Sequence, residues 1–596
     1  MEVILSQQLN DRIASGRRLI VARLAIPYDR LPDDLVLASA WDDRYASMSG
    51  MTPQEEIWDV PHRVTLGIER AEKLYATGIL ALSDFLNSYH ELKLDVWSWE
   101  MIIGPWLQLF THQLVAKIMT FESFSGLDSI ASFALDQEDY YFPWDPAEFT
   151  AMLTDHDGYQ WQLWTPILKH YQVACERLPK KLIPQNKTQF QLNNRTSVYK
   201  QSFNNMLTSA SHLLWKENRV LMTEPYIESI SDRLKLIFKS HLRVTQHDYY
   251  YPCTIWAKID ETERLKSLNS ISENNCAEDL VFPRCVKTFL PILFLEGFRD
   301  VKKVLDKKVK FIPEIHFSAN AIHSNDLFRI LLAFNRSKTK LLYQQHGAGY
   351  GMDRRHVIEE LERKLSDKYF TCGWPGAEKD GYLPVPKLQK TISKNSNSLT
   401  PLFSVNVYPR FVYRIHHQPM GGIWKRVSEE NIVEFFRKVN SPQKILMRVH
   451  PIHEYGWRFK ERLLSEGIDC QFDDNQTPFI KRLRRTSIYI SNHYGTSFLE
   501  SVANDIPTLL FLDKKIYCFR DSFQTIITRL KQCKMVFDSP TDAAEHYNEI
   551  HSNPSEWWEQ TEVRDARQFF LDHYLKQSIS WQQDWISLFN SESPVA

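Results

Sequence analysis

The chain has 596 residues, of which 43% are hydrophobic and 24% are charged, and its formal net charge is −1. This length exceeds what one compact core holds and predicts two or three domains, and the composition is typical of a folded chain rather than a disordered one. The neutral balance excludes a whole-chain electrostatic attraction to nucleic acid, so we expect no nucleic-acid partner.

The eight cysteines are scattered and form no CxxC pair. This spacing disfavours a zinc site and a disulfide scaffold, and it fits a reducing cytoplasm. The first 18 residues contain no long apolar run and no small-residue cleavage site, so we expect no secretory leader. We therefore expect a cytoplasmic protein without a resident metal or cofactor.

The first 290 residues predict a mixture of short strands and long helices. Residues 18–25 and 35–38 are expected to be strands, and Trp41-Asp42-Asp43-Arg44 follows the second strand, where ligands gather in open α/β sheets. Asp43 is thus a candidate proton acceptor, although a solvated turn explains it equally simply. Helices are expected at 64–91, 97–121 and 225–241, with irregular structure and short helices between 136 and 218. The 97–121 helix is interrupted by charged and polar residues, which predicts a buried helix rather than a membrane span.

From Phe289 onward, apolar strands alternate with amphipathic helices, a pattern typical of a parallel α/β sheet. Strands are expected at 290–295, 314–318, 340–345 and 368–373, with helices at 298–305, 326–335 and 355–366. Residues 376–400 are polar, contain two prolines and predict a linker.

A second alternation follows, with strands at 402–408, 444–449, 468–472 and 487–491, two more apolar runs at 508 and 535, and helices between them. The predicted organisation is an N-terminal α/β domain at 1–375 with a helical insertion at about 62–285, the linker, and a C-terminal α/β domain at 401–596 closed by helices. Ligands would bind in a central cleft between the carboxyl ends of the two sheets.

The segment Ser491 to Asp513 contains the clearest candidate site. Tyr494, Gly495, Thr496 and Ser497 lie between a strand and a helix, where a glycine permits a sharp turn and free N–H groups attract a phosphate. Glu500 follows three residues after Ser497. It is placed either to cap the helix, as in an ordinary strand–loop–helix, or to bind a sugar hydroxyl of the same ligand.

A second candidate follows the 340–345 strand, where His346 begins a loop containing Gly347, Gly349 and Gly351. The glycines let the backbone approach a substrate, and the histidine is suited to proton transfer. A histidine that caps a helix is the alternative. The loop is neither a Walker A motif nor a dinucleotide fingerprint, because the required spacing is absent.

The third candidate is His450, which precedes Pro451 at the end of the 444–449 strand. Arg448 shares its sheet face, and this pair suits a phosphate, with simple packing as the alternative. A metal site formed by His450, His453 and Glu454 is disfavoured, because the spacing is weak evidence.

Four segments carry a family resemblance: WSWEMIIGPWLQLF (97–110), QQHGAGYG (344–351), YFTCGW (369–374) and NHYGTSFLESVANDIPTLLF (492–511). They resemble a family of bacterial transferases found among genes for surface-carbohydrate and nonulosonate (sialic-acid-like) biosynthesis. More distantly, the organisation is similar to GT-B glycosyltransferases that use CMP-activated acidic sugars, and to the polyol-phosphate polymerases of wall teichoic acid.

The resemblance implies a GT-B-like fold of two Rossmann-like domains. It also implies His346 near the reaction centre, His450, Thr496 and Ser497 on the donor phosphate, and Glu500 on a ribose. The expected activity is metal-independent transfer of a sugar, such as a nonulosonic acid from a CMP donor, to a glycan or lipid-linked acceptor, with peripheral association at the inner membrane. A polyol-phosphate transferase and a non-catalytic sugar- or nucleotide-binding scaffold are the alternatives.

Overall fold

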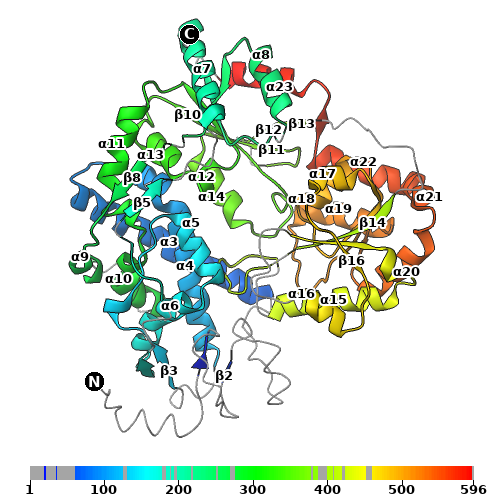
Figure 1. Cartoon of the computed structure of the whole chain (residues 1–596), viewed down its shortest axis with the longest axis horizontal. Helices are drawn as coiled ribbons and strands as arrows, with labels where there is room; N and C mark the ends of the chain where they lie inside the picture. Colours follow the sequence, from blue (N-terminus) through cyan, green and yellow to red (C-terminus); the bar gives the residue numbers. More distant parts are fainter. Residues whose placement is uncertain are drawn as a thin grey trace.

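The computed structural model describes residues 19–21, 35–36, 61–124, 131–177, 183–187, 189–192, 198–215, 219–227, 229–249, 251, 253–268, 276–376, 380–386, 399–406, 408–418, 423–450 and 459–592. Asp43, Pro451, His453 and Glu454 lie outside the described residues. Two six-stranded sheets organise the rest of the chain, and they lie in separate halves of the molecule (Figure 1).

The N-terminal sheet has the strand order β12-β11-β10-β9-β6-β7, and every neighbouring pair is parallel. Its strands are β6 (Val220–Thr223), β7 (Val244–Gln246), β9 (Ile315–Ser318), β10 (Lys340–Gln344), β11 (Lys368–Thr371) and β12 (Gly381–Tyr382). Its helices include α7 (Val198–Leu214), α8 (Ile230–Lys239), α11 (Phe298–Lys308), α12 (Ala321–Ser324), α13 (Asp326–Phe334) and α14 (Val357–Leu365).

The C-terminal sheet has the order β16-β15-β14-β17-β18-β19 and is also parallel throughout. Its strands are β14 (Thr400–Val405), β15 (Leu446–Val449), β16 (Gln471–Phe472), β17 (Thr486–Ser491), β18 (Thr508–Phe511) and β19 (Val536–Phe537). Its helices are α15 (Ile423–Lys438), α16 (Phe459–Ser465), α17 (Phe479–Leu483), α18 (Thr496–Ala503), α19 (Asp521–Gln532), α20 (Pro540–Ile550), α21 (Pro554–Trp558) and α22 (Thr561–Tyr574). Two parallel sheets with intervening helices confirm the predicted GT-B-like α/β fold class.

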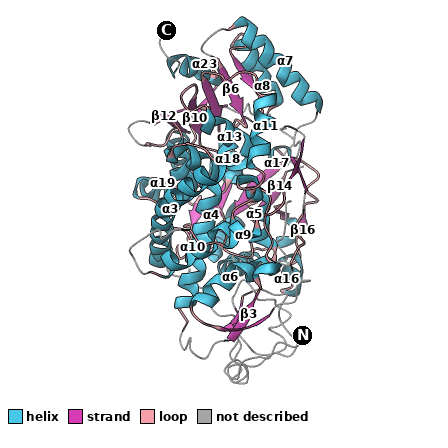
Figure 2. Cartoon of the chain, turned by 90° about the vertical axis from the view of Figure 1, so that its left-hand side faces the viewer, coloured by secondary structure: helices cyan, strands magenta, loops and turns pink. Residues whose placement is uncertain are grey.

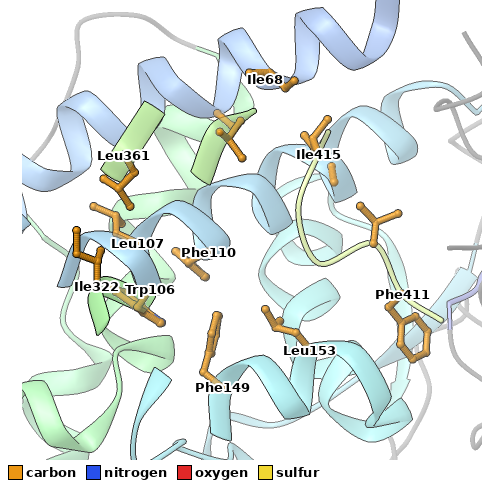
Figure 3. Close-up of a cluster of buried hydrophobic side chains, with 14 of the residues drawn as sticks. Ile68, Trp106, Leu107, Phe110, Phe149, Leu153, Ile322, Leu361, Phe411 and Ile415 are labelled. Atoms are coloured by element: carbon orange, nitrogen blue, oxygen red, sulfur yellow. The ribbon is translucent and has the colours of Figure 1, made fainter. Parts of the chain in front are cut away.

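A helical layer joins the two halves through one hydrophobic core. It is built on α3 (Pro61–His90) and α4 (Val96–Glu122), which match the predicted helices, with α5 (Pro146–Asp155), α6 (Asp157–His170), α9 (Glu261–Leu265) and α10 (Ala277–Phe289) around them. Figure 3 shows Trp106, Phe110 and Leu153 of this layer in one cluster of buried side chains with Phe411 and Ile415, which follow β14. The chain leaving the C-terminal sheet is therefore packed against the N-terminal helices.

The remaining strands form short pairs outside the two sheets: β1 (Leu19–Ile20) with β2 (Leu35–Val36), β3 (Ala131–Ala134) with β4 (Ala174–Arg177), β5 (Gln189–Leu192) with β8 (Cys253–Trp256), and β13 (Val385–Pro386) with β20 (Gln577–Ser578). Three-residue 3₁₀ helices occupy η5 (Gln137–Asp139), η7 (Ile292–Phe294) and η9 (Pro442–Lys444).

Three features differ from the predicted organisation. The expected strand at 290–295 is wrong, because those apolar residues form the buried 3₁₀ helix η7. The N-terminal sheet draws β6 and β7 from the expected helical insertion and β12 from the expected linker. These three strands are short and flanked by polar residues, so they lack the hydrophobic periodicity from which a strand is predicted.

The third difference concerns the C-terminus. Helix α23 (Trp581–Glu592) packs on the N-terminal sheet, where the Trp585 and Phe317 ring centroids are 5.2 Å apart. Glu592 accepts from Lys340 and Lys368 at the starts of β10 and β11. Figure 2 shows α23 at the same end of the molecule as β6, α7 and α8. Helix α23 thus connects the C-terminal half of the chain to the N-terminal sheet through packing and ion pairs.

Candidate functional site

The His346 loop begins where β10 ends at the carboxyl edge of the N-terminal sheet. Gly347, Gly349 and Gly351 have φ angles of +82°, +93° and +70°, a region that L side chains rarely adopt. At Gly351 a Cβ atom would lie 2.4 Å from the Trp374 ring, so only glycine fits there. The close approach in the structure is to neighbouring parts of this chain, and the predicted approach to a substrate stays a prediction.

His346 lies against a buried carboxyl group that the sequence did not single out. Its Nδ1 is 3.6 Å from Oε1 of Glu362, a fully buried residue of α14, and 3.2 Å from the Tyr350 hydroxyl. The same Glu362 oxygen accepts a hydrogen bond from the Tyr350 hydroxyl at 2.9 Å and lies within hydrogen-bond distance of His323 Nε2, also at 2.9 Å. Two histidines and a tyrosine thus share one carboxyl oxygen.

Burial sets the protonation of this cluster. It raises the pKa of the Glu362 carboxyl to about 8, because a charge there is poorly solvated. The pKa of His346 is lowered by burial, although the Glu362 charge acts in the opposite direction. The pKa of His323 falls to about 3 through burial and the nearby Arg329 and Arg414 charges. At neutral pH His346 is therefore an uncharged imidazole able to accept a proton.

The start of α18 lies at the carboxyl edge of the C-terminal sheet, after β17. Gly495 is the residue before the helix, and no side chain caps the helix start. The predicted capping box with Glu500 is therefore absent from that position. The Ser497 hydroxyl is 2.7 Å from the Tyr489 hydroxyl, which orients it. The first amides of α18 present the positive end of the helix dipole.

The expectation that Gly495 is needed for a sharp turn is wrong. Gly495 has φ −72° and ψ −175°, an extended conformation open to any residue, so no sharp turn requires glycine. Glycine is needed for space instead, because a Cβ atom would lie 2.8 Å from Nδ1 of His493. Burial lowers the pKa of His493 to about 4, so this imidazole is neutral.

The two predicted loops meet between the domains. A Cβ atom on Gly347 would lie 2.8 Å from Oγ1 of Thr496, which places the His346 loop directly against the start of α18. The Tyr494 hydroxyl donates to Asp353, and backbone hydrogen bonds join Arg354 N to Cys518 O at 2.9 Å. The carboxyl edges of the two sheets are therefore brought together at the residues that the sequence selected.

Asp353 is a second buried acid in this junction. It accepts from the Tyr494 hydroxyl and, at 2.6 Å, from the Gln418 amide. Burial raises its pKa to about 7, against the opposing effect of these donors and of the Arg520 and Arg414 charges. Asp353 thus links the N-terminal domain to two separate segments of the C-terminal domain.

A cavity of about 570 Å³ opens beside this junction. Its walls come from α5 and from the segment 406–418 that follows β14, together with His493. The segment is anchored by Ile415, which is fully buried and whose N–H donates to His112 Nδ1 at 3.1 Å. Figure 3 shows Phe411 and Ile415 pointing into the same core as Leu153 of α5. This anchoring leaves the intervening Arg414 facing the cavity.

His450 and Arg448 lie at the end of β15, two strands from β17 along the same edge. His450 is exposed, and partial burial and the Arg448 charge lower its pKa. Arg448 is buried and donates to Asp473 at 3.0 Å and to the Thr477 carbonyl at 2.9 Å. Its guanidinium is thus held within the domain, and the phosphate roles of both residues stay predictions.

The sequence reasoning missed Glu362, His323, Asp353 and Arg414. The first three are helix or loop residues whose importance comes from burial beside His346 and Tyr494, which no local pattern encodes. Arg414 had a signal, because Arg410, Arg414, His416 and His417 follow the β14 strand within twelve residues.

No metal site accompanies the two loops in the part of the chain that the structure describes. Three acids that could hold an ion are Asp136, Glu138 and Asp139, in and beside η5, and Arg177 pairs with all three. Among the described helices, none is both long and apolar enough to cross a membrane.

The chain matches several solved structures at low sequence identity, among them the following three. The wall teichoic acid polymerase TagF is 9% identical with a TM-score of 0.34, over 67% of this chain and 98% of that one. MurG of Acinetobacter baumannii is 10% identical with a TM-score of 0.31, over 62% and 99%. The O-GlcNAc transferase of Thermobaculum terrenum is 9% identical with a TM-score of 0.32, over 91% and 99%.

No curated protein matches the chain. One family model does, and it spans residues 29–589, which include both sheets, the His346 loop, the start of α18 and the cavity. The chain belongs to the LIC12162 family of transferases.

Proposed function

We propose that the protein is a glycosyltransferase that moves a sugar from a nucleotide-sugar donor to a glycan acceptor. The observation that carries the proposal is the contact between Gly347 and Thr496, which brings a histidine loop from one parallel sheet against an uncapped helix start from the other. In parallel α/β sheets, ligands bind at the carboxyl ends of the strands, and here two such edges coincide.

The start of α18 would hold the donor phosphate. Its first amides and the Thr496 and Ser497 hydroxyls would donate hydrogen bonds to the leaving phosphate, on which negative charge develops. His450 and Arg448 from β15 would border the donor, and Glu500 would bind its ribose. These cationic and dipolar groups would do the work that a metal ion does elsewhere.

His346 would take the proton of the acceptor hydroxyl. A neutral imidazole accepts a proton, and the Glu362 carboxyl group, whose oxygen lies 3.6 Å from Nδ1, would orient the ring for that step. The acceptor oxygen then bonds to the sugar carbon as the bond from that carbon to the donor phosphate breaks. Asp43, outside the described residues, is the other proton acceptor proposed from the sequence.

The family resemblance supports a more specific donor and acceptor. We propose a CMP-linked nonulosonic acid as donor and a surface glycan, free or lipid-linked, as acceptor. A lipid-linked acceptor would require the protein to work at the cytoplasmic face of the inner membrane, in peripheral association with it.

Nucleotide binding and turnover test the proposal. Thermal-shift and NMR titrations with CMP, CDP, UDP and GDP on the full chain should show binding of at least one nucleotide, and CMP without CDP would favour the CMP-sugar donor. His346→Ala should abolish transfer and leave nucleotide affinity within a few fold. His450→Ala should weaken nucleotide binding by about 1.5–3 kcal/mol, roughly 10- to 150-fold.

His573→Ala is the matched control, because His573 is exposed on α22 and bonds only its own helix backbone at 2.8 Å among the contacts that the structure describes. It should change neither property. Absence of binding to all four nucleotides would contradict both the glycosyltransferase and the polyol-phosphate transferase. Full turnover by His346→Ala would remove the role of His346 as base.

A further inference from the structure

Arg414 is a cation without an ion-pair partner in the part of the chain that the structure describes. Other arginines around the junction are paired: Arg520 with Glu359 at 3.1 Å, Arg355 with Glu360 at 2.7 Å and Arg448 with Asp473 at 3.0 Å. No carboxylate among the described residues lies within ion-pair distance of Arg414, and its Nε is buried without a hydrogen-bond partner there.

The charge of Arg414 is nevertheless felt throughout the junction. After burial, it is the largest influence lowering the pKa of His356, His416 and His112. It also lowers the pKa of Asp353. A half-buried guanidinium that acts on so many neighbours, with no carboxylate in ion-pair distance among the described residues, is suited to bind an anion.

The surroundings of Arg414 are suited to an anion. The 570 Å³ cavity brings it together with donors from His416, Gln418 and His493, and with Asn406 and Tyr408. Burial keeps His416 and His493 neutral, so neither ring adds charge to the cavity. Asp155, at the exposed rim, is the acidic residue among the described lining residues. The guanidinium carbon of Arg414 lies over the Tyr413 ring, 5.0 Å from its centroid, in a cation–π contact.

We propose that Arg414 and this cavity form a subsite for an oxyanion, a carboxylate or a phosphate, that one of the two substrates carries. A guanidinium binds either group through two parallel N–H donors, which a neutral cavity does not provide. This subsite rests on the proposed function for its biological meaning, but its chemistry is tested separately. It also limits the substrates, because a neutral hexose alone would leave the guanidinium unpaired.

Calorimetric titration of the full chain with three probes tests the subsite: inorganic phosphate, N-acetylneuraminate and the neutral N-acetylmannosamine. At least one anionic probe should bind, and Arg414→Gln should weaken it by roughly 10-fold or more, the scale of a lost charge-assisted hydrogen bond. Arg414→Lys should retain part of the affinity, because an ammonium keeps the charge and loses the planar fork. The affinity for N-acetylmannosamine, if any is measured, should be the same in the wild type and in both variants.

Arg437→Gln is the control, because Arg437 is an exposed, paired arginine on α15. It should bind each probe as the wild type does. Circular dichroism and melting of each variant separate a lost subsite from a lost fold, and ¹³C-histidine spectra should show His416 and His493 shifting with the bound anion in the wild type.

The probes also distinguish the source of the anion. A preference for N-acetylneuraminate assigns the subsite to a sugar carboxylate, and a preference for phosphate assigns it to a phosphate of the donor or acceptor. Equal anion affinity in the wild type and in Arg414→Gln, or no anion binding by the wild type, would contradict the proposed subsite. Nucleotide binding in the experiment above decides the proposed function independently, since Arg414-dependent anion binding with no nucleotide binding would leave the subsite standing and remove the glycosyltransferase.

Discussion

The contact between Gly347 and Thr496 makes a prediction that separates two physical effects. Gly347→Ala adds a methyl group at a residue with φ +82°, where it would lie 2.8 Å from Thr496 Oγ1 on the other domain. Gly467→Ala adds the same methyl group at φ +71°, where nothing lies within 4 Å. The two variants share the backbone strain, and only the first has the contact between domains.

The magnitudes follow from these geometries. A non-glycine residue in the left-handed region costs about 1–2 kcal/mol, so Gly467→Ala should destabilise its domain by about that amount. Gly347→Ala should cost about 1–3 kcal/mol more, because the β-branched Thr496 side chain has few rotamers into which it can retreat. Thr496→Ala removes the obstructing oxygen, so the double variant should return to the cost of strain alone.

Calorimetric melting of the wild type, the three single variants and the two double variants that combine Thr496→Ala with Gly347→Ala or with Gly467→Ala measures both couplings. The coupling between Gly347→Ala and Thr496→Ala should reach at least about 0.5 kcal/mol, and Gly467→Ala should show none with Thr496→Ala. Equal melting temperatures for Gly347→Ala and Gly467→Ala, together with additive behaviour, would refute the direct contact between the His346 loop and α18.

Three further predictions concern the buried acids and the C-terminal helix. As the pH rises from about 5 to 8, the wild type should lose up to about 4 kcal/mol of stability that Glu362→Gln does not lose. The reason is that between pH 4.5, the ordinary pKa of this carboxyl group, and its raised pKa of about 8, the folded wild type keeps a proton on Glu362 that the unfolded chain has released. Urea denaturation at both pH values measures this, and a difference that does not change with pH would contradict the raised pKa. Tyr494→Phe should lower the free energy of unfolding by about 1–3 kcal/mol, because buried Asp353 loses its hydrogen-bond donor from the other domain. Tyr382→Phe, on an exposed ring, is the control, and equal melting temperatures for the two variants would argue against the contact. Trp585→Ala should release α23 from the N-terminal sheet, at about 3–5 kcal/mol, and limited proteolysis should then cut before α23 faster than in the wild type; an unchanged cleavage rate would show that α23 is held by its salt bridges alone.

Local patterns were sufficient for much of the framework. The periodicity of α3 and α4 gave both helices to within a few residues, and the alternation after residue 298 gave both sheets their central strands. The loops at His346 and Tyr494 were found because glycine and hydroxyl residues directly follow apolar strands. Those signals are local, so one sequence contains them.

What escaped prediction depends on contacts between distant segments. Residues 292–294 are apolar enough for a strand, yet a short buried run does not distinguish a strand from a helical turn. Glu362 looks like one of several acids on an amphipathic helix, and only its full burial beside His346 changes its pKa. Arg414 lines the cavity, with no carboxylate beside it among the residues that the structure describes, because the chain after β14 packs on α4 and α5, and the order of the elements does not reveal this packing.

A structure of the full chain with its tightest-binding nucleotide tests the central claim most directly. A phosphate of the nucleotide should accept hydrogen bonds from the first amides of α18 and from the Thr496 or Ser497 hydroxyl, and the His346 ring should face it across the junction. A nucleotide bound away from residues 493–500, with the Gly347–Thr496 contact unchanged and closed to ligand, would contradict it.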